Sequence, residues 1–280
     1  MTYLVVSGAS LLAVAAVMTV TALVARRQQR VAVVDTAWGL GFVVVALVAA
    51  TVATLLDEGH PWRRWVVLAL VGLWGLRLAR HMHRRNSGKG EDPRYAEMLG
   101  DAPFSVAVRR VFLTQGVAMW FVSLPVQITA AAGGAWGALA AAGSLVFLVG
   151  LAFESIGDAQ LAAYKKDPER GPVMDRGLWA WTRHPNYFGD AAVWWGIWLI
   201  AASAWPGALT VLSPLVMTWF LVRGTGARLL ERTMMQRPGY PEYAARTSMF
   251  LPWPPKRGRR RGKNHDRAAD DAPGAPSAAR

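Results

Sequence analysis

The stretch that decides the fold is GLWAWTRHPNYFGDAAVWWGIW, residues 177–198. The polar run 183–187 contains Pro185, which is excluded from a helix interior. Residues 187–205 are apolar and rich in tryptophan, and the run is long enough to cross a bilayer. Asp190 lies a few residues inside it, and an acid within a membrane helix is costly and normally functional. The stretch therefore predicts a membrane helix with a polar site at one end.

The composition is that of an integral membrane protein. Of the 280 residues, 53% are hydrophobic, and they come in blocks. The absence of cysteine excludes disulfides, thiolate metal sites and cysteine nucleophiles. The first apolar block has no basic residues before it and is too long for the core of a signal peptide. No dinucleotide-binding glycine fingerprint, phosphate-binding loop or hydrolase serine motif is present, so we expect no Rossmann domain.

Seven apolar blocks predict an all-α bundle of about seven transmembrane helices. The blocks are residues 2–25, 31–56, 62–78, 111–132, 135–153, 187–205 and 208–222. In this arrangement all Lys and Arg residues except Arg63 and Arg64 fall on one side of the membrane. The positive-inside rule then puts the N-terminus outside and the C-terminus in the cytoplasm. The expected location is a bacterial-type inner membrane.

Residues 1–255 are interpreted as one transmembrane domain, and residues 256–280 as a disordered basic tail. The tail begins with a cluster of Lys and Arg beyond the last apolar segment, so anionic lipid headgroups are its expected partners rather than nucleic acid. The remaining polar residues gather at the cytoplasmic level of the bundle. This layout is typical of an enzyme that takes a soluble cofactor from the cytosol and an apolar substrate from the bilayer.

RHPNYFGD, preceded by GLW and followed by WWG, resembles bacterial membrane proteins related to the C-terminal domain of steroid 5α-reductase. The later runs LLERTM (229–234), RPGYPEY (237–243) and RTSMF (246–250) are similar to the same family, so the resemblance spans about residues 35–254. The core pattern RHPxY, with a later Glu and GYxxY, is also similar to isoprenylcysteine and phospholipid methyltransferases. The resemblance implies an NADPH-dependent reductase of a carbon–carbon double bond in a lipid-soluble enone, steroid-like or isoprenoid-like.

The resemblance implies an NADPH site built from several helices. Asn186 and Asp158 match an Asn and an Asp that contact NADPH in the reductases, Asp190 matches a Glu, and Glu154 replaces an Asn. Glu154 and Asp158 are four residues apart and share one helix face, where they form either a solvated helix end or a polar wall for the cofactor.

The other cofactor candidates flank this set. Arg183 and Lys165 are candidates for phosphate because charge-assisted donors hold phosphate best. The remaining members are His184, Tyr187, Glu231, Tyr240 and Tyr243, whose alternative roles are a helix cap for the first two and interfacial anchoring for the last three.

Asp35 and His81 are the catalytic candidates. A protonated Asp35 in an apolar setting would hydrogen-bond a substrate carbonyl, as a helix-two Glu does in the related reductases; the alternative is an acid that complements a helix dipole. His81 ends the third block, where it meets substrate or phosphate, or else belongs to a basic end that anchors the helix. No third ligand stands at metal spacing from His81 and His83, so we expect no metal site.

The sequence is also compatible with two other functions. The methyltransferase relatives bind S-adenosylmethionine at the same RHPxY turn, which implies a lipid or isoprenoid methyltransferase. A membrane protein that only binds a lipid or sterol is the third alternative.

Overall fold

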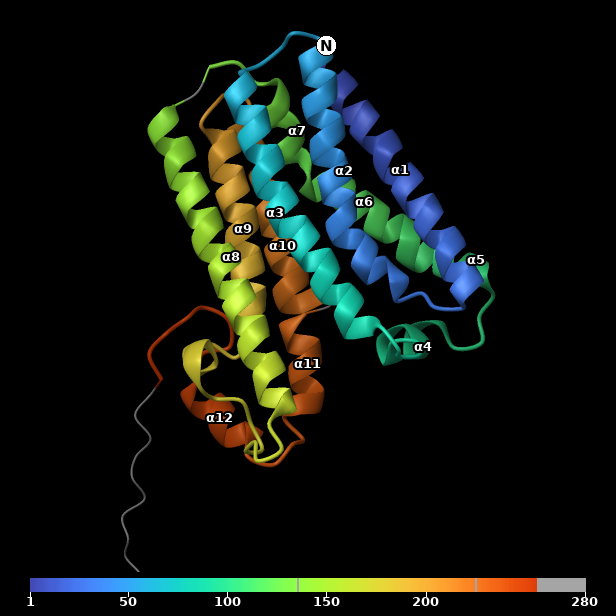
Figure 1. Cartoon of the computed structure of the whole chain (residues 1–280), viewed down its shortest axis with the longest axis vertical. Helices are drawn as coiled ribbons and strands as arrows, with labels where there is room; N and C mark the ends of the chain where they lie inside the picture. The colour runs from blue at the N-terminus through green and yellow to red at the C-terminus, as the bar shows by residue number, and fades with distance from the viewer. Residues whose placement is uncertain (135, 225, 256–280) are drawn as a thin grey trace, which may run out of the picture.

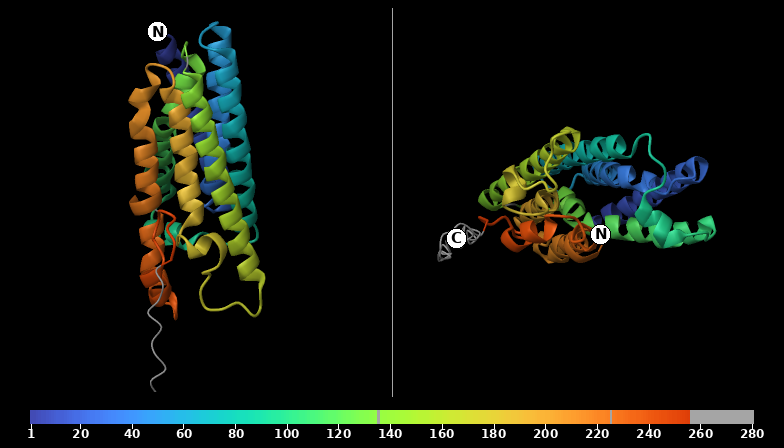
Figure 2. Two further views of the ribbon diagram at one scale, coloured as in Figure 1. Left: turned by 90° about the vertical axis from the view of Figure 1, so that its left-hand side faces the viewer. Right: turned by 90° about the horizontal axis from the view of Figure 1, so that it is seen from below.

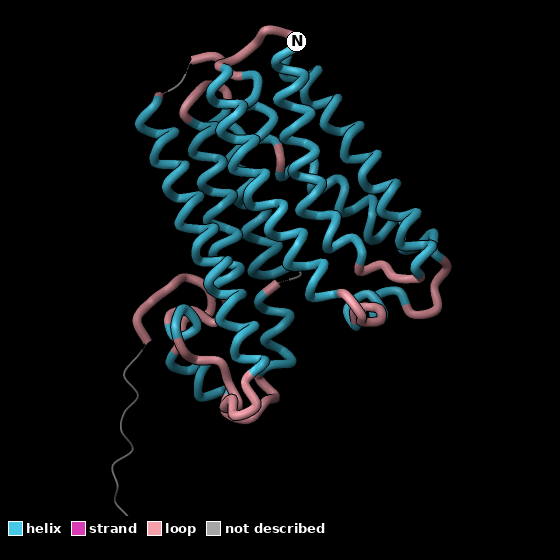
Figure 3. Tube along the Cα trace, viewed as in Figure 1, coloured by secondary structure: helices cyan, strands magenta, loops and turns pink. Residues whose placement is uncertain are grey.

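The computed structural model describes residues 1–134, 136–224 and 226–255, and this part of the chain is helical without a β-strand (Figure 3). Long helices run side by side in Figure 1, and the bundle is broad in that view and narrow from the side in Figure 2. Loops and short helices lie at its two ends. The all-helical prediction is confirmed.

The helices follow the predicted apolar blocks in order. Those that build the bundle are α1 (Thr2–Gln28), α2 (Val33–Leu55), α3 (Pro61–Asn86), α6 (Thr114–Val122), α7 (Leu124–Ala131), α8 (Gly137–Lys166), α9 (Pro185–Ala202) and α10 (Leu212–Trp219). Short helices at the lower end in Figure 1 are α4 (Pro93–Leu99), α5 (Phe104–Ala107), α11 (Ala227–Met234) and α12 (Tyr240–Arg246). Two π-helical segments, Val108–Leu113 and Phe220–Gly224, and two 3-10 turns, Gly177–Ala180 and Gly207–Val211, complete the described elements.

Within the described residues, five helical segments are long and apolar enough to cross a membrane. A sixth is the pair Phe104–Val122 and Leu124–Ala131, if the two count as one span bent by 41°. Helix α9 is helical as predicted but is not among these segments, and it carries Asn186 and Asp190 in its first two turns. The chain is therefore a helical membrane protein.

Three predicted boundaries are wrong. The block ending at Phe153 continues as α8 to Lys166, and the block ending at Leu78 continues as α3 to Asn86. Block 111–132 is broken at Ser123, where Pro125 removes a backbone donor from the first turn of α7. Glu154 and Asp158 therefore lie inside a long helix rather than at its end.

Arg63 and Arg64, the two basic residues outside the main charge clusters, are buried near the opposite end of the bundle. The Arg63 guanidinium donates to the carbonyl oxygens of Gly134 (3.0 Å) and Ile200 (2.8 Å). Arg64 donates to the hydroxyl of Thr54 at 2.8 Å. Arginine complements the partial negative charge of carbonyls near a helix C-terminus, so these two side chains join helix ends and loops.

Helices α8 and α9 approach each other through glycines spaced seven residues apart, and they lie side by side in Figures 1 and 2. On α8, a Cβ at Gly143 would lie 2.7 Å from the Gly196 carbonyl oxygen, and one at Gly150 would lie 2.6 Å from that of Gly189. A Cβ at Gly157 would meet the Pro185 ring at 3.1 Å. Small residues let membrane helices pack backbone to backbone, so side chains next to these glycines face the partner helix directly.

A second close contact joins α2 to α3, where a Cβ on Gly75 would lie 2.6 Å from the Gly39 carbonyl oxygen. Next to it, Phe42, Trp74 and Trp194 pack edge to face or tilted, with ring centroids 4.5 to 5.7 Å apart. All three rings are buried. This aromatic core connects α2, α3 and α9 and lies directly above the polar groups described below.

The glycine contact generates a first prediction. Gly150→Ala forces α8 and α9 apart, because backbone atoms of α9 occupy the position of the new methyl group, and we expect it to lower the free energy of unfolding by about 1–3 kcal/mol. The matched control is Gly8→Ala in α1, where no atom lies within 4 Å of the new Cβ. Thermal unfolding in detergent, followed by tryptophan fluorescence, should show a lower Tm for the first variant only. Equal Tm values would show that the helices do not depend on this contact.

Candidate functional site

Two acids of α8 share one arginine of α3. Arg77 forms ion pairs with both Glu154 and Asp158. The Trp74 indole N–H, one turn before Arg77, donates to Glu154 Oε2 at 3.0 Å. Both acids are at most 8% exposed. A buried carboxylate is costly unless it is paired and hydrogen-bonded, and here Arg77 and Trp74 supply those partners.

Helix α9 completes this acid cluster. The Asn186 side-chain amide donates to Asp158 Oδ1 at 3.2 Å. One turn later, Asp190 Oδ1 is buried and has no hydrogen-bond partner among the described residues. The indole nitrogen of Trp194, one further turn on, also lacks a partner there. Trp194 is also the side chain whose hydrogen bonding acts on Asp190, so the two groups lie near each other without a full hydrogen bond. Buried polar atoms are normally satisfied, so this pair marks a place where a ligand or water group would complete the bonding.

Arg183 and His184 come from the turn before α9 and converge on Glu231 of α11. Arg183 Nε and Nη2 donate to the two oxygens of Glu231 at 2.6 and 2.9 Å. Arg183 Nη1 donates to the carbonyls of Ala244 and Thr247 at 2.7 and 2.8 Å. His184 Nε2 lies 3.2 Å from Glu231 Oε1. All three nitrogens of the Arg183 side chain therefore donate hydrogen bonds within the protein, whereas the sequence predicted that Arg183 binds phosphate.

The two tyrosines of α12 support the same turn. The Tyr240 hydroxyl lies 3.5 Å from Glu231 Oε1, and burial and the Glu231 charge raise the pKa of Tyr240 to about 12. The Tyr243 hydroxyl donates to the Trp179 carbonyl at 2.6 Å, and the Trp179 indole donates to the Gly157 carbonyl at 3.0 Å. Burial raises the pKa of Tyr243 as well. Both phenols are thus neutral hydrogen-bond donors at physiological pH.

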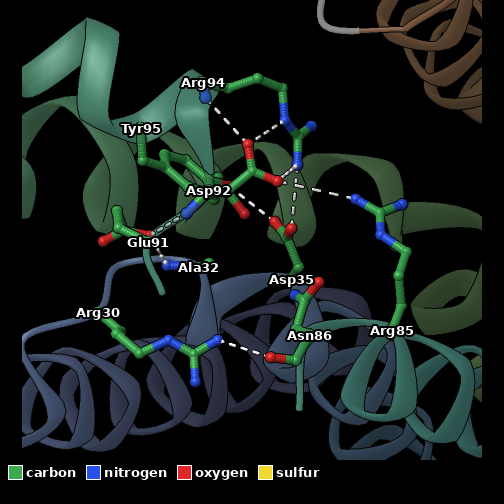
Figure 4. Close-up of polar contacts among 10 residues, drawn as sticks. Arg30, Ala32, Asp35, Arg85, Asn86, Glu91, Asp92, Arg94 and Tyr95 are labelled. Atoms are coloured by element: carbon green, nitrogen blue, oxygen red, sulfur yellow. Dashed lines mark hydrogen bonds and ion pairs between the residues drawn. The ribbon is translucent and has the colours of Figure 1, made fainter. Parts of the chain in front are cut away.

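A third group surrounds Asp35 in the first turn of α2 (Figure 4). The Tyr95 hydroxyl donates to Asp35 Oδ1 at 2.7 Å, and Arg94 Nη2 donates to Oδ2 at 3.1 Å. The sequence interpretation gave Asp35 the role of a hydrogen-bond donor, but in the structure both of its oxygens are acceptors. Tyr95 is the donor instead, and it also receives a hydrogen bond from Gln115 at 3.3 Å.

The loop before α4 holds Tyr95 in position. Asp92 caps α4 by accepting from the Arg94 backbone N–H at 2.9 Å, and the side-chain hydrogen bond from Arg94 lowers the pKa of Asp92. Glu91 accepts from the backbone N–H groups of Val31 and Ala32 and so caps the start of α2 (Figure 4). Burial, with the charge of Asp35, raises the pKa of Tyr95, so its hydroxyl stays protonated.

Tyr187 lies between the acid cluster and the Asp35 group. Its ring stacks on that of His184 with centroids 5.5 Å apart, and Arg94, Arg85, Asp190 and Asp158 are the charges that act most on its hydroxyl. The polar groups contributed by α2, α3, α4, α8 and α9 therefore occupy one level of the bundle.

The two remaining predicted residues stand at the edge of this level. His81 Nε2 is 3.7 Å from Asp158 Oδ2, at the limit of an ion pair. Lys165 is exposed near the end of α8, and Arg85, Lys89 and Arg237 are the cations that act most on it. These side chains form a basic border around the buried acids. Among the described residues, no group of three or more side chains is arranged to hold a metal ion.

A cavity of about 350 Å³ opens beyond the acid cluster, between the loop 171–176 and α12. Tyr243 lines it together with Asp175, Arg176 and Arg246. Through Tyr243 and Trp179 it connects to Gly157, the residue before Asp158. The cavity shares no lining residue with the acid cluster and touches only the structure that supports the turn before α9.

Sequence reasoning missed Trp74, Tyr95 and Gln115. The signal for Tyr95 was available, because Asp92 followed by Pro93 is a helix start and places Tyr95 in the first turn. Trp74 and Gln115 carry no such signal, since most membrane tryptophans and glutamines serve in belts and packing.

The comparisons with known proteins give a family and no relative of known activity. A model of the family described as "Protein of unknown function (DUF1295)" matches residues 21–247. No curated protein and no solved structure matches the chain. The matched range includes all the polar groups described above.

The Arg183–Glu231 pair generates a second prediction. Glu231→Gln replaces the carboxylate next to Arg183 with a neutral amide and leaves the partly buried Arg183 charge unpaired. We therefore expect a loss of about 1–3 kcal/mol in the free energy of unfolding. Asp175→Asn is the matched control, because it breaks a pair with Arg246 that is largely exposed and contributes about 0–1 kcal/mol. Thermal unfolding of both variants checks this, and an equal or larger loss for Asp175→Asn would contradict it.

Proposed function

Since the chain belongs to the DUF1295 family of proteins of unknown function, we propose a function from the polar groups that its helices bring together. The protein is a membrane-embedded, NADPH-dependent reductase of a carbon–carbon double bond in a lipid-soluble enone. The observation that carries this proposal is the single polar level, in which an amide, three carboxylates and a carboxylate–phenol pair meet beneath an aromatic core.

The proposed topology has seven spans, with α9 as the sixth, the N-terminus outside and the C-terminus in the cytoplasm. Its support is the distribution of charge, since the clusters of Lys and Arg in the sequence fall on one side of such an arrangement. The polar level then faces the cytoplasm from the inner leaflet of the plasma membrane. Water-soluble cofactors reach it from below, and apolar substrates reach it from the bilayer.

The residues of the acid cluster fit a nicotinamide carboxamide, which both donates and accepts hydrogen bonds. Asn186 offers a donor and an acceptor, Asp158 an acceptor, and Asp190 an acceptor that lacks a partner within the protein. Glu154 is engaged by Trp74 and Arg77 and orients this group rather than binding the ligand. Bound NADPH supplies the hydride for the reaction.

The phosphates of a dinucleotide need cations that are not already neutralised. Arg183 is bound to Glu231, and with His184, Tyr240 and Tyr243 it shapes the turn. Lys165 and the basic residues around it remain for phosphate, because they border the cluster from the solvent side, and His81 offers a ring nitrogen beside them.

Asp35 and Tyr95 are proposed to act on the substrate carbonyl. The Tyr95 hydroxyl has one proton, which Asp35 accepts in this structure, so a bound substrate carbonyl would replace Asp35 as its acceptor and gain a hydrogen bond that stabilises charge developing on the carbonyl oxygen. Gln115 donates to the phenol oxygen and holds the ring, and Arg94 balances the charge of Asp35. Asp35 is thus a positioning residue in this proposal, with Tyr95 as the catalytic one.

A methyltransferase that uses S-adenosylmethionine is the second candidate, and the same acid cluster favours it. Glu154, Asp158 and Asp190 face one arginine, so the cluster has an excess of carboxylates that would attract a sulfonium cation. The two candidates differ in the charge of the ligand at the buried end of the site.

The third prediction separates these candidates by thermal unfolding in detergent. NADPH at about 100 times its Kd should stabilise the protein by about 2.7 kcal/mol, and S-adenosylmethionine should give no shift. Asn186→Ala should abolish the NADPH shift while the protein stays folded, with a ligand-free Tm lowered only by the loss of the amide bond to Asp158. Gln28→Ala, an exposed amide at the end of α1, is the control and should keep the shift. A shift with S-adenosylmethionine alone would establish the second candidate, and no shift with either ligand would favour a lipid-binding protein.

The fourth prediction concerns Tyr95→Phe. Removing one donor to a developing oxyanion typically lowers kcat by about 10²–10³-fold, and we expect this loss with a 3-keto-4-ene steroid as the probe. Binding of NADPH should stay unchanged, because Tyr95 bonds to Asp35 and Gln115 rather than to the acid cluster. Tyr164→Phe removes a hydroxyl that bonds to the Gly171 carbonyl on the surface and should keep full turnover. Product formation measured by mass spectrometry decides between the roles, since wild-type turnover by Tyr95→Phe would exclude Tyr95 as the donor.

A further inference from the structure

A hollow of about 360 Å³ lies on the side of the bundle away from the acid cluster, at the π-helical segment Val108–Leu113. Its lining residues are Val106, Arg109, Arg110 and Thr114. The segment joins α5 to α6 beside the end of α1 (Figure 1). Neither the reductase nor the methyltransferase proposal uses it.

The hollow carries two cations with free donors. Arg109 and Arg110 are both exposed, and neither forms an ion pair with a carboxylate of the described chain. The Arg110 guanidinium has one long contact, 3.5 Å to the Met98 carbonyl oxygen. Two adjacent guanidinium groups with unused N–H donors form a site for an anion, and phosphate is the anion that arginine recognises best.

The π-helical turn explains how two consecutive arginines come to line one hollow. A π turn is wider than an α turn and is common at functional sites. The Thr114 hydroxyl donates to the Arg109 carbonyl, five residues earlier, at 3.2 Å. This bond joins two lining residues of the hollow and restrains the backbone that carries the two side chains.

The depth of the hollow matches that of the headgroups in the proposed topology. Gly116 packs against Val14 and Met18 of α1, which runs in the opposite direction. Following both helices away from this contact at 1.5 Å per residue brings the two arginines level with about residues 20–25 of α1. The next turn of α1 carries Arg26 and Arg27, which are also exposed.

An exposed apolar track rises from the hollow into the bilayer region. Leu113 and Val117 follow Arg109 at steps of four residues, and they are 61% and 55% exposed. On a helix, positions at this spacing lie on one face. A molecule that binds here therefore meets two cations at its head and apolar side chains along its tail.

We infer that this hollow binds the phosphate of an anionic phospholipid of the inner leaflet, with Arg109 and Arg110 as the headgroup ligands and Leu113 and Val117 as the contacts of an acyl chain. A free phosphate ion would use the arginines alone, whereas the lipid uses both parts. The inference does not depend on the proposed reaction, because the hollow shares no residue with the acid cluster.

The test uses the full-length protein in a neutral detergent, titrated with phosphatidylglycerol or phosphatidylcholine and observed by native mass spectrometry. We expect one saturable phosphatidylglycerol and no such binding of phosphatidylcholine. Arg109→Gln with Arg110→Gln should weaken phosphatidylglycerol binding at least about tenfold. The control pair, Arg26→Gln with Arg27→Gln, removes the same charge about one helix turn away and should weaken it less than about threefold.

Further arms separate the alternatives. Arg109→Lys with Arg110→Lys should retain more affinity than the Gln pair, and the Tm of each variant must equal that of the wild type to exclude misfolding. Equal weakening by the two Gln pairs would reduce the effect to diffuse attraction by the basic end, and equal binding of both lipids would also overturn the inference. Displacement of the lipid by millimolar inorganic phosphate would assign the arginines to a soluble anion instead.

Discussion

The contact between α8 and α9 is the constraint on which the rest of the structure depends. Glycines at intervals of seven residues on both helices bring the two backbones together, with Gly189 directly against the backbone of Glu154. The glycines on that stripe have no side chain to bury, and lipid provides no hydrophobic driving force for the association of helices. Dispersion contacts between the backbones must therefore hold the pair. The same stripe fixes the rotation of both helices. Glu154 and Asp158 therefore face Asn186, and Asp190 enters the bundle rather than the bilayer.

Three carboxylates in one part of a membrane bundle would repel one another without cations and donors from other helices. Arg77 and Trp74 of α3 provide these partners, and α3 is held against α2 through Gly39 and Gly75. The chain of contacts thus runs from one glycine pair to the acid cluster and on to a second glycine pair. Because removing one partner from a buried charge costs more than the pair contributes, each helix contact is also an electrostatic requirement.

The sequence predicted the helical class and the apolar segments, because blocks of apolar residues are a strong signal of helices in a membrane. It also singled out Asp158 and Asn186, which the structure brings together, through their family resemblance.

The sequence failed where the signal depends on partners distant in the chain. Nothing in the neighbourhood of Arg183 indicates that Glu231 takes its charge, and nothing near Asp35 indicates the bond from Tyr95. The ends of α3 and α8 were misjudged because both helices continue with polar residues that hydropathy does not distinguish from loops. The tail 256–280 lies outside the described residues.

The RHPN turn, residues 183–186, and the start of α9 contain residues that support the fold and residues that belong to the acid cluster. Arg183 and His184 are satisfied by Glu231 and by backbone carbonyls, so a ligand anion would have to displace a carboxylate to reach them. Asn186 and Asp190, one helix turn apart, point the other way, and Asp190 keeps an oxygen without a donor. A buried acceptor without a donor costs about 1–3 kcal/mol, and a ligand N–H group placed there recovers that free energy on binding. In the proposed reductase or methyltransferase, Arg183 and His184 would position the turn, and Asn186 and Asp190 would meet the ligand that offers the matching donor.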